Sequence, residues 1–149
     1  MIIVRPANYT DCHKIFELRN DFLARRMFRN SQVLKMQEHV RWFQKSLKNK
    51  NINLLICLDK NRKIASVRFD RNKLTAKVSI NLCRAKRGKG IAKICLDKSI
   101  NFYNKKFPKI KIIYAEIKFN NIASKKTFKN VGFKFMLKSG KFLHYCIDL

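Results

Sequence analysis

The sequence predicts an α+β fold, in which one mixed, mainly antiparallel, twisted sheet carries helices on both faces. Several short runs alternate apolar and polar residues, as half-buried strands do, and several longer runs place apolar residues at steps of three and four, as amphipathic helices do. In chain order these runs give β-α-α-β-β-β-α-β-α-β-β. With 149 residues, 46% of them hydrophobic, the chain can bury one core, and we expect a single domain over residues 1–149.

The first half of the chain is expected to form a strand, two helices and a hairpin. Residues 1–6 are the predicted first strand. Thr10 is the expected N-cap of a helix that ends near Asn20, and residues 22–32 are basic and irregular. The hairpin joins strands at residues 52–58 and 64–70. The second helix is predicted for residues 36–47, with a buried face of Met36, Val40, Phe43 and Leu47.

The second half alternates strands and helices before a last hairpin. A strand at residues 76–83 precedes a helix with apolar residues at Ala92, Leu96, Ile100, Tyr103 and Phe107. Pro108 ends that helical pattern, because proline cannot continue a helix. A strand at 110–117, a helix at 121–130 and a hairpin of 132–137 with 142–149 complete the sheet.

The charge of the chain is unusual, with 35 Lys and Arg against 9 Asp and Glu and a formal net charge of +26. Such an excess favours anionic partners, including nucleic acid. The lysines are spread along the chain without a run of five. We therefore expect a solvated surface whose field attracts anionic substrates, with a specific nucleic-acid or ribosomal partner as the alternative.

Five cysteines are an odd number and include no C-x-x-C pair: Cys12, Cys57, Cys83, Cys95 and Cys146. Most lie among apolar residues, so we expect reduced thiols, a cytoplasmic protein and no metal site. No apolar run approaches the roughly 20 residues of a membrane span, and the N-terminus is too short for a signal peptide. We expect no membrane association.

The segment Arg87-Gly88-Lys89-Gly90-Ile91-Ala92 follows a predicted strand and opens a predicted helix. Glycines allow positive φ and a close approach of backbone N–H groups to a ligand, and the first N–H groups of a helix lack intrahelical partners. Together with two basic side chains they form a site suited to a diphosphate. A tight turn with solvated charges is the simpler alternative. The segment matches neither the dinucleotide fingerprint nor a Walker loop.

Two motifs resemble the GNAT (Gcn5-related N-acetyltransferase) superfamily. Arg87-x-x-Gly90-x-Ala92 is similar to its pyrophosphate-binding motif. The stretch from Glu116 through Asn121, Ser124 and Phe128 to Gly132-Phe133 is similar to its later strand, loop and helix. The resemblance covers essentially the whole chain and implies the GNAT fold, acetyl-CoA as acetyl donor and no metal.

The resemblance also implies how acetyl-CoA is held. In GNAT enzymes two neighbouring parallel strands separate and admit the pantetheine arm; they correspond here to residues 79–83 and 113–117. One strand N–H would polarise the thioester oxygen. Asn121 is equally well explained as a helix N-cap. The implied cofactor-binding residues are Leu82, Cys83, Arg84, Arg87, Gly88, Lys89, Gly90, Ile91, Ala92, Asn121, Ser124 and Phe128.

The acceptor amine arrives largely protonated near pH 7 and must lose a proton. Glu116 stands where several GNAT enzymes carry a catalytic glutamate, so it is the candidate general base; otherwise it is a strand-end carboxylate paired with a lysine. The usual general acid is a tyrosine, and here that position holds Phe128. Tyr145, Tyr114 or solvent would then protonate the leaving thiolate. No Cys–His pair suggests an acetyl-enzyme, so we expect direct transfer.

Acceptor-side motifs resemble the GNAT branch that acetylates the 4-amino group of UDP-linked amino sugars for pseudaminic and related nonulosonic acids. The motifs are Leu18–Asp21, Glu38–Phe43, Val67–Asp70 and Ser79–Leu82. Relatives often carry a carboxylate where this chain has Lys77. The implied substrate-binding residues are Arg19, Asn20, His39, Trp42, Arg68, Asp70, Ser79 and Asn81.

Each of these residues also has a structural interpretation. A tryptophan such as Trp42 is more often part of the core, where it buries a large apolar area, than a surface for a ligand. A single histidine such as His39 more often makes structural hydrogen bonds. Arg68 and Asp70 are two apart, so they would share one face of a strand as an ion pair.

Two other functions stay open from the sequence. Acetylation of a ribosomal-protein N-terminus would suit the charge of +26, because the ribosome is anionic. A basic nucleic-acid-binding module, a different class, would instead show aromatic residues clustered with basic ones and a steep salt dependence. The expected oligomeric state is a monomer or a homodimer.

Overall fold

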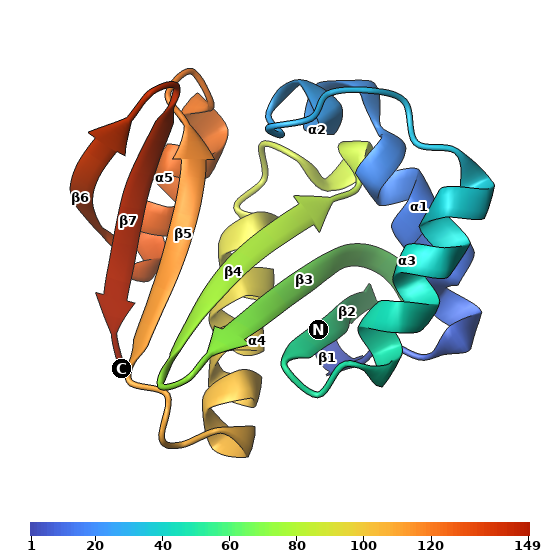
Figure 1. Cartoon of the computed structure of the whole chain (residues 1–149), viewed down its shortest axis with the longest axis horizontal. Helices are drawn as coiled ribbons and strands as arrows, with labels where there is room; N and C mark the ends of the chain where they lie inside the picture. Colours follow the sequence, from blue (N-terminus) through green and yellow to red (C-terminus); the bar gives the residue numbers. More distant parts are fainter.

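The computed structural model describes residues 1–149 and contains one seven-stranded sheet (Figure 1). Its strands are β1 (Ile2–Pro6), β2 (Ile52–Asp59), β3 (Arg62–Asn72), β4 (Thr75–Leu82), β5 (Ile112–Lys118), β6 (Lys134–Ser139) and β7 (Phe142–Asp148). They lie in the order β1-β2-β3-β4-β5-β7-β6. Every neighbouring pair is antiparallel except β4 and β5, which are parallel. The predicted mixed, mainly antiparallel sheet is confirmed.

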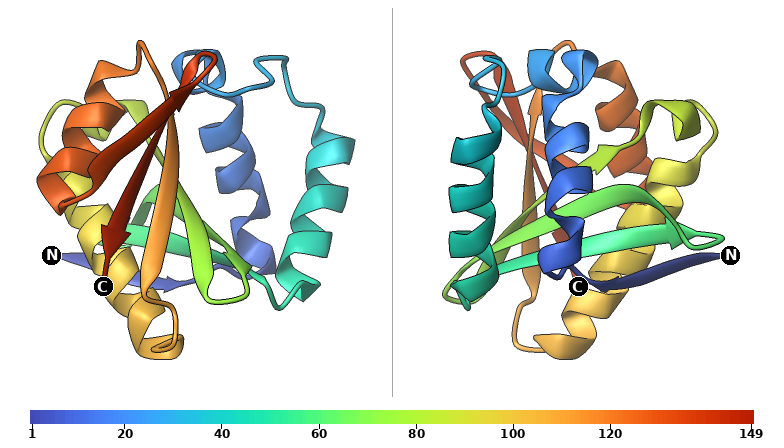
Figure 2. Two further views of the ribbon diagram at one scale, coloured as in Figure 1. Left: turned by 60° about the vertical axis from the view of Figure 1, so that its left-hand side comes forward. Right: turned by 90° about the vertical axis from the view of Figure 1, so that its right-hand side faces the viewer.

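Helices cover both faces of this sheet (Figure 2). One face carries α1 (Cys12–Asn20) and α3 (Met36–Lys48), and the other carries α4 (Ile91–Lys106) and α5 (Ile122–Val131). Each helix begins and ends within a few residues of the range that apolar spacing predicted, because that spacing gives each helix one face to bury. The two-sided arrangement confirms the predicted fold class.

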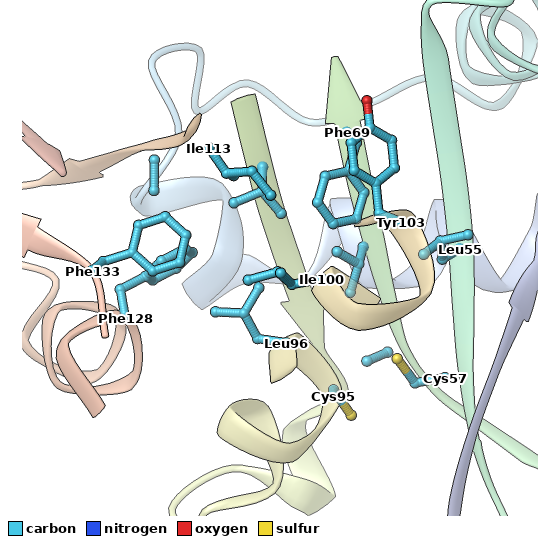
Figure 3. Close-up of a cluster of buried hydrophobic side chains, with 14 of the residues drawn as sticks. Leu55, Cys57, Phe69, Cys95, Leu96, Ile100, Tyr103, Ile113, Phe128 and Phe133 are labelled. Carbon is cyan, nitrogen blue, oxygen red and sulfur yellow. The ribbon is translucent and has the colours of Figure 1, made fainter. Parts of the chain in front are cut away.

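The larger core fills the space between the sheet and helices α4 and α5 (Figure 3). Phe69 of β3 stacks on Tyr103 of α4 with ring centroids 4.1 Å apart, and Leu96 and Ile100 lie beside them. A smaller cluster, made of Ile15, Phe43, Leu54 and Ile56, joins α1 and α3 to the opposite face. The sheet is therefore anchored on both sides, which fixes the strand positions that form the site.

The first helix begins differently from the prediction. A short 3-10 turn (Tyr9–Asp11) precedes it, and Asn8, not Thr10, accepts the first N–H. Asp11 is buried; Arg5 donates two hydrogen bonds to its carboxylate at 2.7 and 2.9 Å, and Lys63 pairs with it at 2.8 Å. Burial raises the pKa of Asp11, but these bonds and the Asn8 N–H outweigh it and lower the pKa to about 2.

Two further expectations for the N-terminal half are corrected. Residues 22–26 form a short helix, α2 (Phe22–Arg26), where the sequence appeared irregular, because the Asp21 carboxylate caps it by accepting the Ala24 N–H. In α3 the buried residues are His39, Phe43 and Ser46, whereas Met36 and Leu47 are more than a third exposed. The buried face is rotated because hydrogen bonds satisfy the His39 ring inside the protein.

All five cysteines are free thiols, with Cys57 and Cys95 buried. No helix of the structure has the length and apolar character needed to cross a membrane. No three His, Cys, Asp or Glu side chains gather in a way that suits a metal ion.

Candidate functional site

The parallel strands β4 and β5 pair only at their beginnings and then separate (Figure 1). Their register covers Thr75 to Lys77 on β4 and Ile112 to Tyr114 on β5, and no pairing continues beyond it. From Val78 and Ala115 onward, the two strands turn unpaired backbone edges toward each other. Backbone N–H and C=O groups in such a gap need partners, so an extended polar chain can bind between them.

A glycine-containing loop and a helix start lie at the wide end of this gap, directly after β4. Gly88 and Gly90 have φ of +73° and +75°, as the loop prediction required. The N–H groups of residues 88–90 donate no hydrogen bond within the chain, and no side chain caps α4. Several N–H groups and the positive end of the helix dipole are therefore available to an anion.

The two arginines of this loop are held by Asp21, which lies between α1 and α2. Arg87 donates to Asp21 at 3.0 Å and, through Nε, to the Leu82 carbonyl at 3.1 Å; Arg84 donates to Asp21 at 3.2 Å. Burial raises the pKa of Asp21, but the hydrogen bond from the Ala24 N–H and the two arginines have the larger effect, so the pKa lies below its usual value. The carboxylate therefore stays ionised. Asp21 thus fixes the loop conformation and offsets part of its positive charge.

The start of α5 forms the other side of the wide end. Asn121 caps this helix by accepting the Ser124 N–H at 3.1 Å, so its structural interpretation is confirmed. Phe128 is buried and packs edge-to-face on Phe133 at 4.9 Å between ring centroids. The aromatic ring at the family's tyrosine position is therefore part of the core.

Glu116 of β5 lies on the sheet face that carries α1 and α3. Its Oε1 accepts a 2.6 Å hydrogen bond from Arg29 Nε, while Oε2 lies 4.0 Å from His144 Nδ1. The Arg29 hydrogen bond lowers the pKa of Glu116, against a smaller effect of burial. Glu116 is thus paired with an arginine rather than with a lysine, and one of its oxygens has no close partner.

Tyr145, the other expected catalytic residue, lies on the opposite sheet face. It pairs in register with Ala115, the neighbour of Glu116, and side chains alternate between faces along a strand. Its ring is buried beside α5 and lines a groove with Leu143. The structure does not bring Tyr145 together with Glu116, because the pleat directs their side chains to different layers.

Arg19 of α1 occupies a position without any carboxylate partner. Its guanidinium lies 3.6 Å from the centroid of the Trp42 ring and donates to His39 Nδ1 at 3.0 Å. Burial lowers the pKa of Arg19 to about 10, and the charge of Arg68 adds to this effect. An arginine that is partly desolvated, unpaired and next to a second arginine favours an anionic ligand.

His39 has a structural role, as one interpretation of the sequence allowed. Its Nε2 donates to the Cys12 carbonyl at 2.8 Å, which leaves Nδ1 as the acceptor for Arg19. Burial lowers the pKa of His39, consistent with a neutral ring. His39 thus positions Arg19. The same guanidinium covers the Trp42 ring, which leaves less of that ring open to a ligand.

Of the remaining predicted acceptor residues, Arg68, Asp70 and Asn20 have side-chain partners within the chain, whereas Ser79 and Asn81 are placed by their strand register. Arg68 and Asp70 form the expected same-face ion pair, at 2.8 and 3.0 Å, and Asn20 accepts the Leu34 N–H, which holds the segment between α2 and α3. Ser79 faces Arg68 in register, and Asn81 faces Ser66. Ser79 therefore lies on the same face as Arg68.

Two residues of the site were missed from the sequence: Asp21 as the anchor of the loop and Arg29 as the partner of Glu116. Arg29 lies 87 positions before Glu116, in a segment without periodicity, so no local pattern indicates the contact. Arg29 also lies over the Phe142 ring at 4.1 Å, and Lys118 of β5 donates to the Arg26 carbonyl at 2.9 Å. These contacts connect the end of α2 and the segment after it to β5 and β7.

Comparison with known proteins agrees with this geometry. The family model described as Acetyltransferase (GNAT) domain matches residues 1–134. No curated protein sequence matches the chain. Among solved structures, a domain from Methanocaldococcus jannaschii DSM 2661 is similar with a TM-score of 0.85 and 25% identity, covering 100% of this chain and 99% of that one.

Two further solved structures share the fold. A ribosomal-protein-alanine N-acetyltransferase from Brucella melitensis gives a TM-score of 0.82 at 16% identity, with 99% of each chain covered. The protein yncA from Salmonella typhimurium, solved with its cofactor acetyl-CoA, gives 0.80 at 18% identity, covering 99% of this chain and 93% of that one. At 16% and 18% identity, these two similarities show a shared fold and do not show a shared substrate.

Proposed function

The chain belongs to the GNAT acetyltransferase family, an enzyme class that transfers acetyl from acetyl-CoA to an amine, and from this premise we propose how its residues do so. Residues 1–149 act as one N-acetyltransferase domain. The five free thiols suit a reducing compartment such as the cytoplasm.

The donor would be held at the gap between β4 and β5. The free N–H groups of residues 88–90 and the uncapped start of α4 would bind its diphosphate, with Lys89 adding charge. Arg87 orients this loop through Asp21. The unpaired edges of β4 and β5 would accept the pantetheine arm, and a strand N–H there would polarise the thioester oxygen as charge develops on it.

Glu116 would remove the proton of the acceptor amine, directly or through one water. Its Oε1 is occupied by Arg29, so the proton would go to Oε2. Because the Arg29 bond lowers its pKa, Glu116 is ionised at neutral pH and ready to accept a proton, although it is a weaker base than an unpaired glutamate. Phe128 and Tyr145 are both buried away from Glu116, so Tyr114, which shares the sheet face of Glu116, or solvent would protonate the leaving thiolate.

The acceptor would be anionic, and a UDP-linked 4-amino sugar fits best. The single observation that carries this proposal is Arg19, a partly buried guanidinium stacked on Trp42 without a carboxylate partner. It lies near Arg68, on the same face as Glu116. A diphosphate would supply the countercharge that Arg19 lacks and leave the sugar amine free to reach Glu116.

The test is acetyl transfer measured by mass spectrometry, with acetyl-CoA and either UDP-4-amino sugars or N-terminal peptides of ribosomal proteins. We expect acetylation of the sugar, with KM for the sugar raised at least about tenfold by Arg19→Gln, since a charged hydrogen bond contributes roughly 1.5–3 kcal/mol. Arg41→Gln, on the exposed side of α3, is the control and should leave KM unchanged. Equal KM values in both variants would remove Arg19 from acceptor binding.

A ribosomal-protein N-terminus is the second candidate acceptor. The net charge of +26 and the similarity in fold to the Brucella melitensis enzyme support it. Acetylation of the peptides without reaction of the sugars would establish this candidate and exclude the first.

A further inference from the structure

A second basic surface lies on the far side of α5, outside the separated strands. Between residues 117 and 147 the chain contains no Asp or Glu, and its seven lysines form no ion pair: Lys118, Lys125, Lys126, Lys129, Lys134, Lys138 and Lys141. Two of them, Lys118 and Lys134, belong to the sheet face of Glu116 by strand alternation, and the other five remain for the surface beside α5. Elsewhere, seven of the nine acidic residues pair with basic ones. Positive charge is therefore least compensated in this part of the molecule.

The surface is hollowed as well as charged. A groove of about 530 Å³ runs between α5 and β7, with Leu143 and Tyr145 as its floor, Ile122 at its side and three lysines of α5 around it: Lys125, Lys126 and Lys129. The groove thus has an apolar floor and a cationic rim. No acidic side chain of the chain pairs with the lysines of that rim.

Two exposed aromatic side chains belong to the strands on either side of β7. Phe135 of β6 faces Tyr145 in register with ring centroids 5.8 Å apart, and half of its surface is exposed. Phe119, 45% exposed, follows β5 on the same face, and Lys138 lies 5.5 Å from its ring. Aromatic faces interleaved with lysines are the features by which proteins bind unpaired bases and their phosphates.

We propose that this groove between α5 and β7 binds single-stranded nucleic acid. Lysines of α5 and Lys138 of β6 contact phosphates, and Phe135 and Phe119 stack on bases. A duplex keeps its bases stacked inside its own helix and offers no such contact. This binding is separate from acetyl transfer and does not depend on it. It also accounts for the position of the uncompensated charge, which acceptor binding near Arg19 leaves unexplained.

Two other occupants fit less well. An acidic peptide added as a strand would need a regular edge, but β6 has a bulge between Phe135 and Leu137 and carries Lys134 and Lys138, features that protect edge strands from pairing. A second copy of this chain would bring two basic surfaces together, against a net charge of +26 on each.

The experiment measures fluorescence anisotropy of labelled 12-nucleotide oligo(U) and oligo(A) with the full-length protein at several salt concentrations. The triple variant Lys125→Gln, Lys126→Gln, Lys129→Gln should reduce the slope of log K against log salt by about 2, since each single-strand phosphate contact contributes about 0.7. The matched control removes the same charge at the end of α4 (Lys105→Gln, Lys106→Gln, Lys109→Gln) and should leave the slope nearly unchanged. Phe135→Ala should weaken binding about tenfold.

Thermal unfolding of each variant serves as the folding control, and sedimentation gives the oligomeric state. Equal losses in the two triple variants would show diffuse attraction and overturn the proposal. Duplex RNA bound as tightly as the single strand would also overturn it. So would poly-glutamate that displaces the oligonucleotide from the wild type and from Phe135→Ala at the same concentration, because binding would then depend on charge alone. A dimer that Phe135→Ala dissociates would assign the groove to a second copy instead.

Discussion

Replacing Gly90 by glutamate tests the proposed diphosphate site most directly. Gly90 has φ of +75°, and a Cβ added there would meet no atom within 4 Å. The folding cost is therefore backbone strain alone, about 1–2 kcal/mol for an L-residue in this conformation. The loss of glycine's freedom in the unfolded chain offsets some of it. A net cost of about 1 kcal/mol corresponds to a fall in Tm of about 2–4 °C for a chain of this size.

The effect on acetyl-CoA binding should be larger. A carboxylate about 5 Å from one charge of the diphosphate is repelled by roughly 1 kcal/mol at the dielectric constant of water and by about 3 kcal/mol at an effective value of 20. The diphosphate carries two such charges, so the loss is at least about 2 kcal/mol, more than tenfold in Kd.

Isothermal titration calorimetry with acetyl-CoA is the assay, and Gly140→Glu is the matched control. Gly140 lies in the β6–β7 turn, also has positive φ (+58°) and also has open space at its Cβ. It should show a similar fall in Tm and unchanged affinity. If Gly90→Glu retained wild-type affinity, or if both variants lost it equally, the assignment of the α4 loop to the diphosphate would be refuted.

Three further variants test Glu116, Phe128 and Asp11. Arg29→Gln should raise the pKa of Glu116 toward its usual value of 4.5, so the acidic limb of kcat/KM moves to higher pH. Phe128→Tyr should lower the free energy of unfolding by about 1–3 kcal/mol, measured in urea, because it buries a hydroxyl beside Phe133. The lowered pKa of Asp11 supplies about 2 kcal/mol of stability that is complete above about pH 4 and lost as pH falls toward 2; Asp11→Asn should lack this pH dependence.

Each of these outcomes has a control. The control for Arg29→Gln is Glu116→Gln, which should remove the acidic limb of the kcat/KM profile altogether. If neither variant moved that limb, it would report the titration of another group. Unchanged stability of Phe128→Tyr would mean that the ring edge reaches solvent. If Asp11→Asn kept the wild-type acid transition between pH 4 and 2, other carboxylates would be responsible for it.

Much of the fold followed from local pattern. Strands at residues 52–58 and 64–70 and the helix that follows the glycine loop were predictable because periods of two and 3.6 appear directly in the order of apolar residues. The rotated face of α3 was not, since burial of His39 depends on Cys12 and Arg19 from another helix. Helix α2 was missed because five residues carry too little periodicity, and its cap is a single carboxylate.

The sequence by itself determined the order of elements, the glycines with positive φ at the start of α4 and the position of Glu116 on a strand, because these depend on neighbours in the chain. Only the tertiary structure decided where β4 and β5 part and that Arg29 pairs with Glu116. It also decided that Arg19 has no carboxylate partner and that Tyr145 faces away from Glu116. Those features depend on residues far apart in the chain, which come together only when the sheet and its helices pack.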